Sequence, residues 1–214
     1  MRKYLAEFIG TFALVFCGTG AIIINQESGG VITHVGVAIT FGLIVSAMIY
    51  TVGDISGAHL NPAVTIAFWF SKTFPAKEIL PYILSQGLGA FLASFTLKFL
   101  FPTNNMLGST LPAGSPMQSF VLEIILTFIL MFVIIHIAKG SKEQGMFAGI
   151  AIGGVVMLEA MFAGPICGAS MNPIRSIAPA LVSGNVQHLW VYILAPILGA
   201  MLAVVSWNIL KPKN

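Results

Sequence analysis

The chain has 214 residues, of which only 8% are charged and 57% are hydrophobic, and its formal net charge is +3. An average soluble domain carries about 25% charged residues, and so few charges could not cover the surface of a soluble fold of this size. The composition therefore excludes a soluble globular enzyme, a disordered chain and a nucleic-acid-binding protein, and it leaves a membrane protein with several spans.

Six long apolar runs follow one another along the chain, and each is long enough to cross a bilayer as a helix. They occupy residues 5–24, 35–53, 80–101, 119–138, 146–163 and 188–210. Two shorter runs, at 62–70 and 173–182, are about half the length that a span requires. Because basic residues gather on the cytoplasmic side of a membrane, we place both termini in the cytoplasm. Eight of the ten Lys and Arg residues then lie on that side, and Lys98 and Arg175 are the exceptions.

The two halves of the sequence resemble each other. The pattern that begins at Glu7 returns at Glu123, and the Asn-Pro pair at 61–62 returns at 172–173. Such matches at a near-constant offset indicate an internal duplication. Each half holds three spans, an odd number, so the second half is inverted in the membrane relative to the first. The sequence therefore predicts an all-α membrane protein of six transmembrane helices and two re-entrant half-helices, arranged as an inverted internal repeat.

Each short run begins with asparagine and proline, a combination that favours a helix start. In inverted halves, the helices that start at Asn61 and Asn172 meet N-terminus to N-terminus at the membrane centre. Their positive dipole ends oppose cations and protons there, while the asparagine amides can donate hydrogen bonds to a passing neutral oxygen. Small residues precede each helix, and non-helical backbone at this depth persists where it lines a cavity. We expect six carbonyl groups to form a ladder of acceptors along a pore: those of Gly57, Ala58, His59, Gly168, Ala169 and Ser170.

Three glutamates lie inside predicted spans, where a carboxylate is costly. Glu7 and Glu123 are repeat equivalents, and we expect them to brace the two re-entrant loops by accepting backbone N–H groups rather than to line the pore or relay protons. Glu159 has no repeat partner. It braces Arg175 through hydrogen bonds, faces the permeating solute, or contacts a neighbouring subunit. His34 is expected to be solvated near the outer surface.

The re-entrant segments also carry a resemblance to a known family. Residues 56–65 read SGAHLNPAVT and residues 168–176 read GASMNPIRS, and both resemble the signature loops of the aquaporin superfamily. The resemblance covers essentially the whole chain and implies a right-handed bundle that assembles as a homotetramer with a pore in each protomer. The residues that match the two signature motifs are Asn61, Pro62, Ala63, Asn172, Pro173 and Ile174. Ile174 departs from the family's alanine and predicts additional bulk beside the asparagine pair.

In that family four positions form an outer selectivity filter, which in this chain are Phe41, Ala160, Ala169 and Arg175. This assignment accounts for Arg175, which supplies fixed donors and a charge that rejects cations. Water-selective members resemble Phe-His-small-Arg, so alanine at position 160 predicts a wider filter. The alanines and Ser176 look most like the nodulin-like branch, which carries glycerol, urea, neutral metalloid acids such as arsenite or boric acid, and some water.

We therefore interpret the chain as a passive channel for small uncharged solutes in a cell membrane. A mainly water-selective channel, a secondary transporter and a structural homologue with a closed pore are alternatives, although a transporter would need charge at the re-entrant tips. The sequence contains no nucleophile–base pair, metal cluster or phosphate loop, so we expect neither enzymatic activity nor a cofactor or metal. Cys167 lies near enough to the predicted filter for mercurials to react with it. A single channel domain is expected over 1–214, with halves of approximately 1–108 and 117–214.

Overall fold

The computed structural model describes residues 1–211, and within them it consists of helices and their connections. The six long helices are α1 (Arg2–Glu27), α2 (Thr33–Ser56), α4 (Ile79–Leu100), α5 (Pro116–Ala138), α7 (Ala148–Cys167) and α9 (Leu189–Leu210). All six are long and apolar enough to cross a membrane. The short helices are α3 (Pro62–Phe70) and α8 (Pro173–Ser183). The predicted class, six spans and two half-helices, is confirmed.

Two elements differ from the expectation. A short helix, α6 (Lys142–Met146), and a single 3-10 turn, η1 (Ala76–Glu78), precede α7 and α4. Helix α7 runs on to Cys167 through Pro165, four residues beyond the predicted end at 163.

Pro165 has no N–H, so the carbonyl of Met161, four residues earlier, has no partner of its own helix there. His34 Nε2 lies 2.8 Å from that Met161 oxygen and supplies the missing donor. The expectation that His34 is solvated is therefore wrong, because its ring closes a gap in the hydrogen bonds of α7. This contact is one reason why the proline does not end the helix.

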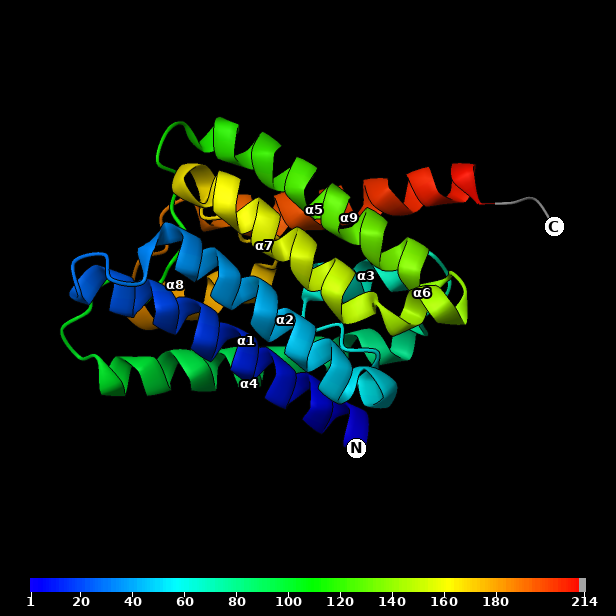
Figure 1. The fold of residues 1–214 in the computed structure, drawn as a ribbon, viewed down its shortest axis with the longest axis horizontal. Coiled ribbons are helices and arrows are strands. Elements are labelled where there is room, and N and C mark those ends of the chain that lie inside the picture. The colour runs from blue at the N-terminus through cyan, green and yellow to red at the C-terminus, as the bar shows by residue number, and fades with distance from the viewer. Residues whose placement is uncertain (212–214) are drawn as a thin grey trace.

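The helices form a bundle in which α1 packs on α2 and α4, α5 packs on α7 and α9, and α2 packs on α7. Both termini lie toward one end of the bundle, together with α6 and α3, while α8 lies toward the other end (Figure 1). Large apolar side chains on the outside are exposed, among them Leu43, Leu88 and Phe162. Such an apolar exterior suits a bilayer as solvent rather than water.

Repeat-equivalent glycines set the closest helix contacts. A Cβ on Gly42 of α2 would lie 2.6 Å from the carbonyl oxygen of Gly153 in α7, and the two residues are 111 positions apart. Gly89 and Gly199 likewise leave no room for a side chain against the backbone of α1 and α5, respectively. The two halves thus use the same small residues for the same backbone approaches, as expected of a duplication.

Candidate functional site

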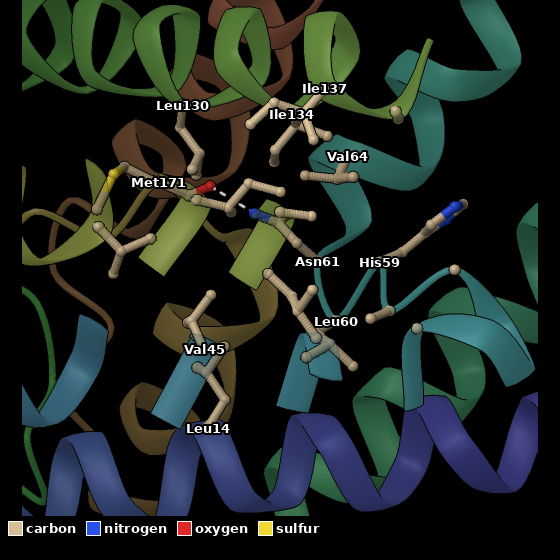
Figure 2. A pocket seen from close by; sticks show the side chains of 18 of the residues that line it. Leu14, Val45, His59, Leu60, Asn61, Val64, Leu130, Ile134, Ile137 and Met171 are labelled. Carbon is tan, nitrogen blue, oxygen red and sulfur yellow. Dashed lines mark hydrogen bonds between the residues drawn. The ribbon is translucent and has the colours of Figure 1, made fainter. Parts of the chain in front are cut away.

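A cavity of about 760 Å³ runs through the bundle and is lined by residues of both halves. Its wall includes the predicted filter residues and both motif asparagines: Phe41, Ala160, Ala169, Arg175, Asn61 and Asn172. Apolar side chains surround the asparagines, as Figure 2 shows for Leu14, Val45, Leu130 and Met171. The wall of the cavity beside the asparagines is therefore largely apolar.

The two asparagines join the halves of the chain at the middle of the cavity. The amide nitrogen of Asn61 donates to the carbonyl oxygen of Met171 at 2.7 Å (Figure 2). Asn172 donates to the carbonyl oxygen of Leu60 at 2.9 Å. Within residues 1–211, neither amide nitrogen makes a further hydrogen bond, so each keeps one N–H available.

Each asparagine also caps the half-helix that follows it. Asn61 Oδ1 accepts from the Ala63 N–H at 2.9 Å, and Asn172 Oδ1 accepts from the Ile174 N–H at 3.2 Å. A proline at the first helical position completes both helix starts. The half-helices therefore meet with their N-termini facing each other, and their positive dipole ends point at one place.

The loops before the half-helices repeat each other residue by residue. Gly57 and Gly168 end α2 and α7 in the left-handed conformation, with φ values of 85° and 83°. Ala58 and Ala169, which follow them, also have positive φ. Among the described residues, no hydrogen bond is accepted by the six carbonyl groups of the predicted ladder. Five of those residues line the cavity, and Gly168 does not: the five are Gly57, Ala58, His59, Ala169 and Ser170.

The two repeat-equivalent glutamates bind the backbone of these loops. Glu7 accepts hydrogen bonds from the backbone N–H groups of His59 at 2.9 Å and Leu60 at 2.7 Å. Glu123 accepts from the equivalent groups of Ser170 at 2.7 Å and Met171 at 2.8 Å. Both carboxylates are fully buried, and neither residue lines the cavity.

Two partners of Glu7 were not expected from the sequence. Gln86 of α4 donates to Glu7 Oε2 at 2.8 Å, and Ser56 donates to Glu7 Oε1 at 2.7 Å. Gln86 also lies 3.1 Å from Thr65 Oγ1 in α3. Because Gln86 is a polar residue inside an apolar span, its presence there was a signal that it needs a buried partner.

Arg175, which lies in the first turn of α8 and lines the cavity, is 2% exposed and is held by two contacts. Its Nη1 donates to the carbonyl oxygen of Gly108 at 2.8 Å, and its guanidinium carbon lies 5.1 Å from the centre of the Phe41 ring. Thr110, near Gly108, donates to Ser176 at 2.8 Å. The connection between α4 and α5 therefore positions the arginine, a role that the sequence did not indicate.

A sequence profile of the major intrinsic protein family matches residues 1–207. The chain belongs to this family. Over its whole length it is 48% identical to aquaporin NIP1-1 of Zea mays, of which it covers 76%. It is 44% identical to nodulin-26 of Glycine max, with 99% of this chain and 78% of the relative covered.

A solved structure agrees with this assignment. The aquaglyceroporin of Plasmodium falciparum superimposes with a TM-score of 0.88 at 25% sequence identity, over 98% of this chain and 96% of that one. This major intrinsic protein is thus a membrane channel for small solutes and not an enzyme.

The structure bears on three further residues around this channel, and for Glu159 it removes one of the three alternatives. Glu159 does not brace Arg175, because among the described residues neither of its carboxylate oxygens has a hydrogen-bond partner. Ile174 adds no bulk to the channel, since it packs in the core of the bundle and does not line the cavity. Cys167 is fully buried, with Sγ 3.6 Å from the carbonyl oxygen of Ala163, and is shielded from the cavity.

Proposed function

We propose that this channel conducts glycerol, urea and neutral metalloid acids such as arsenite or boric acid, together with some water. The observation that carries the proposal is the pairing of two alanines with an arginine and a phenylalanine around the cavity. Ala160 and Ala169 occupy little space, Arg175 presents N–H donors, and Phe41 presents an apolar ring. Glycerol has a C–H face as well as hydroxyl groups, so it matches such a wall better than water does, and urea and the metalloid acids are uncharged molecules that can accept from the arginine donors.

A mainly water-selective channel is the second candidate. It is favoured by the apolar side chains around Asn61, which leave a permeating molecule few hydrogen-bond partners at the centre of the cavity (Figure 2). The relative named aquaporin is consistent with the water-selective candidate, and the solved structure named aquaglyceroporin is consistent with the broader one. Alanine at position 160, where a water-selective filter would have histidine, favours the broader solute range.

Exclusion of ions and protons is proposed from two features of the same cavity. The opposed N-termini of α3 and α8 place positive potential at Asn61 and Asn172, which repels cations. Arg175 adds a fixed positive charge at the filter. A neutral solute crosses both places by exchanging hydrogen bonds with the asparagine amides and the loop carbonyl groups.

We further propose that the whole chain, residues 1–214, is one channel domain that assembles as a homotetramer in a cell membrane. Both termini face the cytoplasm in this arrangement, because seven of the nine Lys and Arg residues of the described chain gather at the end of the bundle that carries the termini. They are Arg2, Lys3, Lys72, Lys77, Lys139, Lys142 and Lys211. Lys213, which the sequence also places on this side, lies outside the described residues.

The test is stopped-flow light scattering on vesicles that contain the purified protein, with gradients of sucrose, glycerol or urea imposed across the vesicle membrane. Glycerol and urea permeabilities well above those of empty vesicles are expected. Glycerol permeability equal to that of empty vesicles, with raised water permeability, would favour the water-selective candidate instead. For ion exclusion, Arg175→Ala should speed the decay of a pH gradient across the vesicles, whereas the exposed-residue control Lys98→Ala should not.

A further inference from the structure

We propose that Gly18 of α1 determines the specificity of the channel by positioning the Phe41 ring at the filter. This inference rests on the proposed role of Phe41 as a filter residue. The absence of a side chain at position 18 lets one edge of the ring lie directly against α1. Gly18 itself does not line the cavity, so it acts through Phe41.

The distances around Gly18 carry the inference. A Cβ built on Gly18 would lie within 2.6 Å of three atoms of the Phe41 ring, Cδ1, Cε1 and Cζ. These three atoms form one edge of the ring, so that edge rests directly on the backbone of α1. A methyl group cannot share this space, and the ring would have to move.

The cavity offers the ring empty space into which it can move. Phe41 is itself one of the residues that line this cavity. Helix α1 cannot retreat freely, because its backbone at Phe8 lies directly against Gly89 of α4. A side chain at position 18 therefore displaces the ring toward the cavity and narrows the filter.

Displacement of the ring also affects the arginine. The guanidinium carbon of Arg175 lies 5.1 Å from the centre of the Phe41 ring, a separation at which the cation is attracted to the ring. Moving the ring therefore changes both the apolar wall and the position of the Arg175 donors. Gly18 thus controls two of the four predicted filter side chains.

The repeat shows that this pairing belongs to the filter and not to the shared architecture. The positions equivalent to Gly18 and Phe41 in the second half, by the offsets of 116 and 111 residues, are Ile134 and Ile152. Both isoleucines line the cavity. A glycine facing a phenylalanine therefore occurs on the filter side, while the equivalent place in the other half holds two aliphatic side chains of equal size.

The test compares Gly18→Ala with Gly20→Ala in vesicles, measuring glycerol and water permeability per reconstituted protein. A Cβ on Gly20 would only touch Leu97 at 3.4 Å, so this control makes the same change in the same helix without a clash. Gly18→Ala should lower the ratio of glycerol to water permeability about tenfold, which corresponds to about 1.4 kcal/mol of added barrier. Gly20→Ala should leave the ratio unchanged.

Repeating the comparison in a Phe41→Leu protein distinguishes an effect that acts through the Phe41 ring from a general disturbance of the fold. In Phe41→Leu protein the clashing ring is gone, so adding Gly18→Ala should change the ratio little. An equal fall of the ratio in both backgrounds, or an unchanged ratio in the single Gly18→Ala variant, would overturn the inference. If the native channel conducts water but not glycerol, the proposed function fails. The inference is then decided by whether Gly18→Ala, and not Gly20→Ala, lowers water permeability.

Discussion

The side-chain amide of Asn61 donates to the backbone carbonyl oxygen of Met171, 110 residues away, over 2.7 Å. Asn172 returns the same bond to Leu60, and Glu7 and Glu123 hold the backbone N–H groups just beside those carbonyls. The centre of the channel is therefore a network of charged and neutral hydrogen bonds that fixes the two loops against each other. The predictions below probe this network and the filter next to it.

Replacing Ala160 with histidine should convert the broad filter into a narrower one. Ala160 lines the cavity, as Arg175 does, and an imidazole there fills space and adds a polar edge. Glycerol permeability should fall about tenfold, equivalent to about 1.4 kcal/mol, while water permeability changes far less. Ala163→Val is a suitable control because Ala163 is buried on the same helix but does not line the cavity. Equal loss of glycerol and water flux in Ala160→His would show that position 160 is not at the constriction.

Removal of the charge should lower the thermal stability of the protein at Glu123 but not at Glu159. In Glu123→Gln one carboxylate oxygen becomes an NH₂ group, so one of the N–H groups of Ser170 and Met171 loses its acceptor. A buried group left unpaired costs about 1–3 kcal/mol, and the midpoint of thermal unfolding in detergent should fall. Glu159→Gln removes a carboxylate that has no partner among the described residues, so it should not lower the midpoint.

Light-scattering assays on the same two variants add a functional readout. Glu123→Gln should lower solute flux per folded protein, because the second loop then loses part of its support. Glu159→Gln should leave flux near the native value. A larger loss of stability in Glu159→Gln than in Glu123→Gln would contradict the assignment of loop support to Glu123.

His34 should matter for stability only while residue 165 is proline. In His34→Ala the Met161 carbonyl loses its donor, at a cost of about 0.5–1.5 kcal/mol. Pro165→Ala restores a helical N–H to that carbonyl. The unfolding midpoint of the double variant His34→Ala/Pro165→Ala should therefore exceed that of His34→Ala alone. Additive losses in the double variant would mean that the two residues do not share the Met161 oxygen.

Mercuric chloride should not block the channel through Cys167. Cys167 is fully buried and does not line the cavity, whereas Cys17 is partly exposed and is best replaced by serine. In that Cys17→Ser background, Ala169→Cys places a thiol on the cavity wall. Water flux through this variant should be blocked by mercuric chloride and restored by a reductant, while the Cys17→Ser parent stays insensitive. Inhibition of the parent would show that the ion reaches Cys167.

Hydropathy alone predicted the six spans, because a bilayer imposes long apolar runs, and the two Asn-Pro pairs predicted the starts of α3 and α8. Contacts between distant segments were not predictable in the same way. Nothing in the sequence near His34 points to the Met161 carbonyl, and nothing near Gly108 points to Arg175. These partners depend on how helices and connections pack in three dimensions. The face on which Glu159 lies also depends on packing, since α7 is apolar nearly all round and has little periodicity to orient it.

The reciprocal bonds of the two asparagines have a consequence for the halves as separate polypeptides. Each amide donates to a carbonyl of the other half, so a half alone can form neither bond. A three-helix fragment could complete this centre only with a complementary fragment inserted in the opposite orientation. The covalent link between α4 and α5 keeps the halves in equal number and at high effective concentration. Two fragments that together keep Thr110 and the α5 cap, 1–113 and 114–214, should therefore reassemble a conducting channel when produced together, whereas either fragment by itself should not.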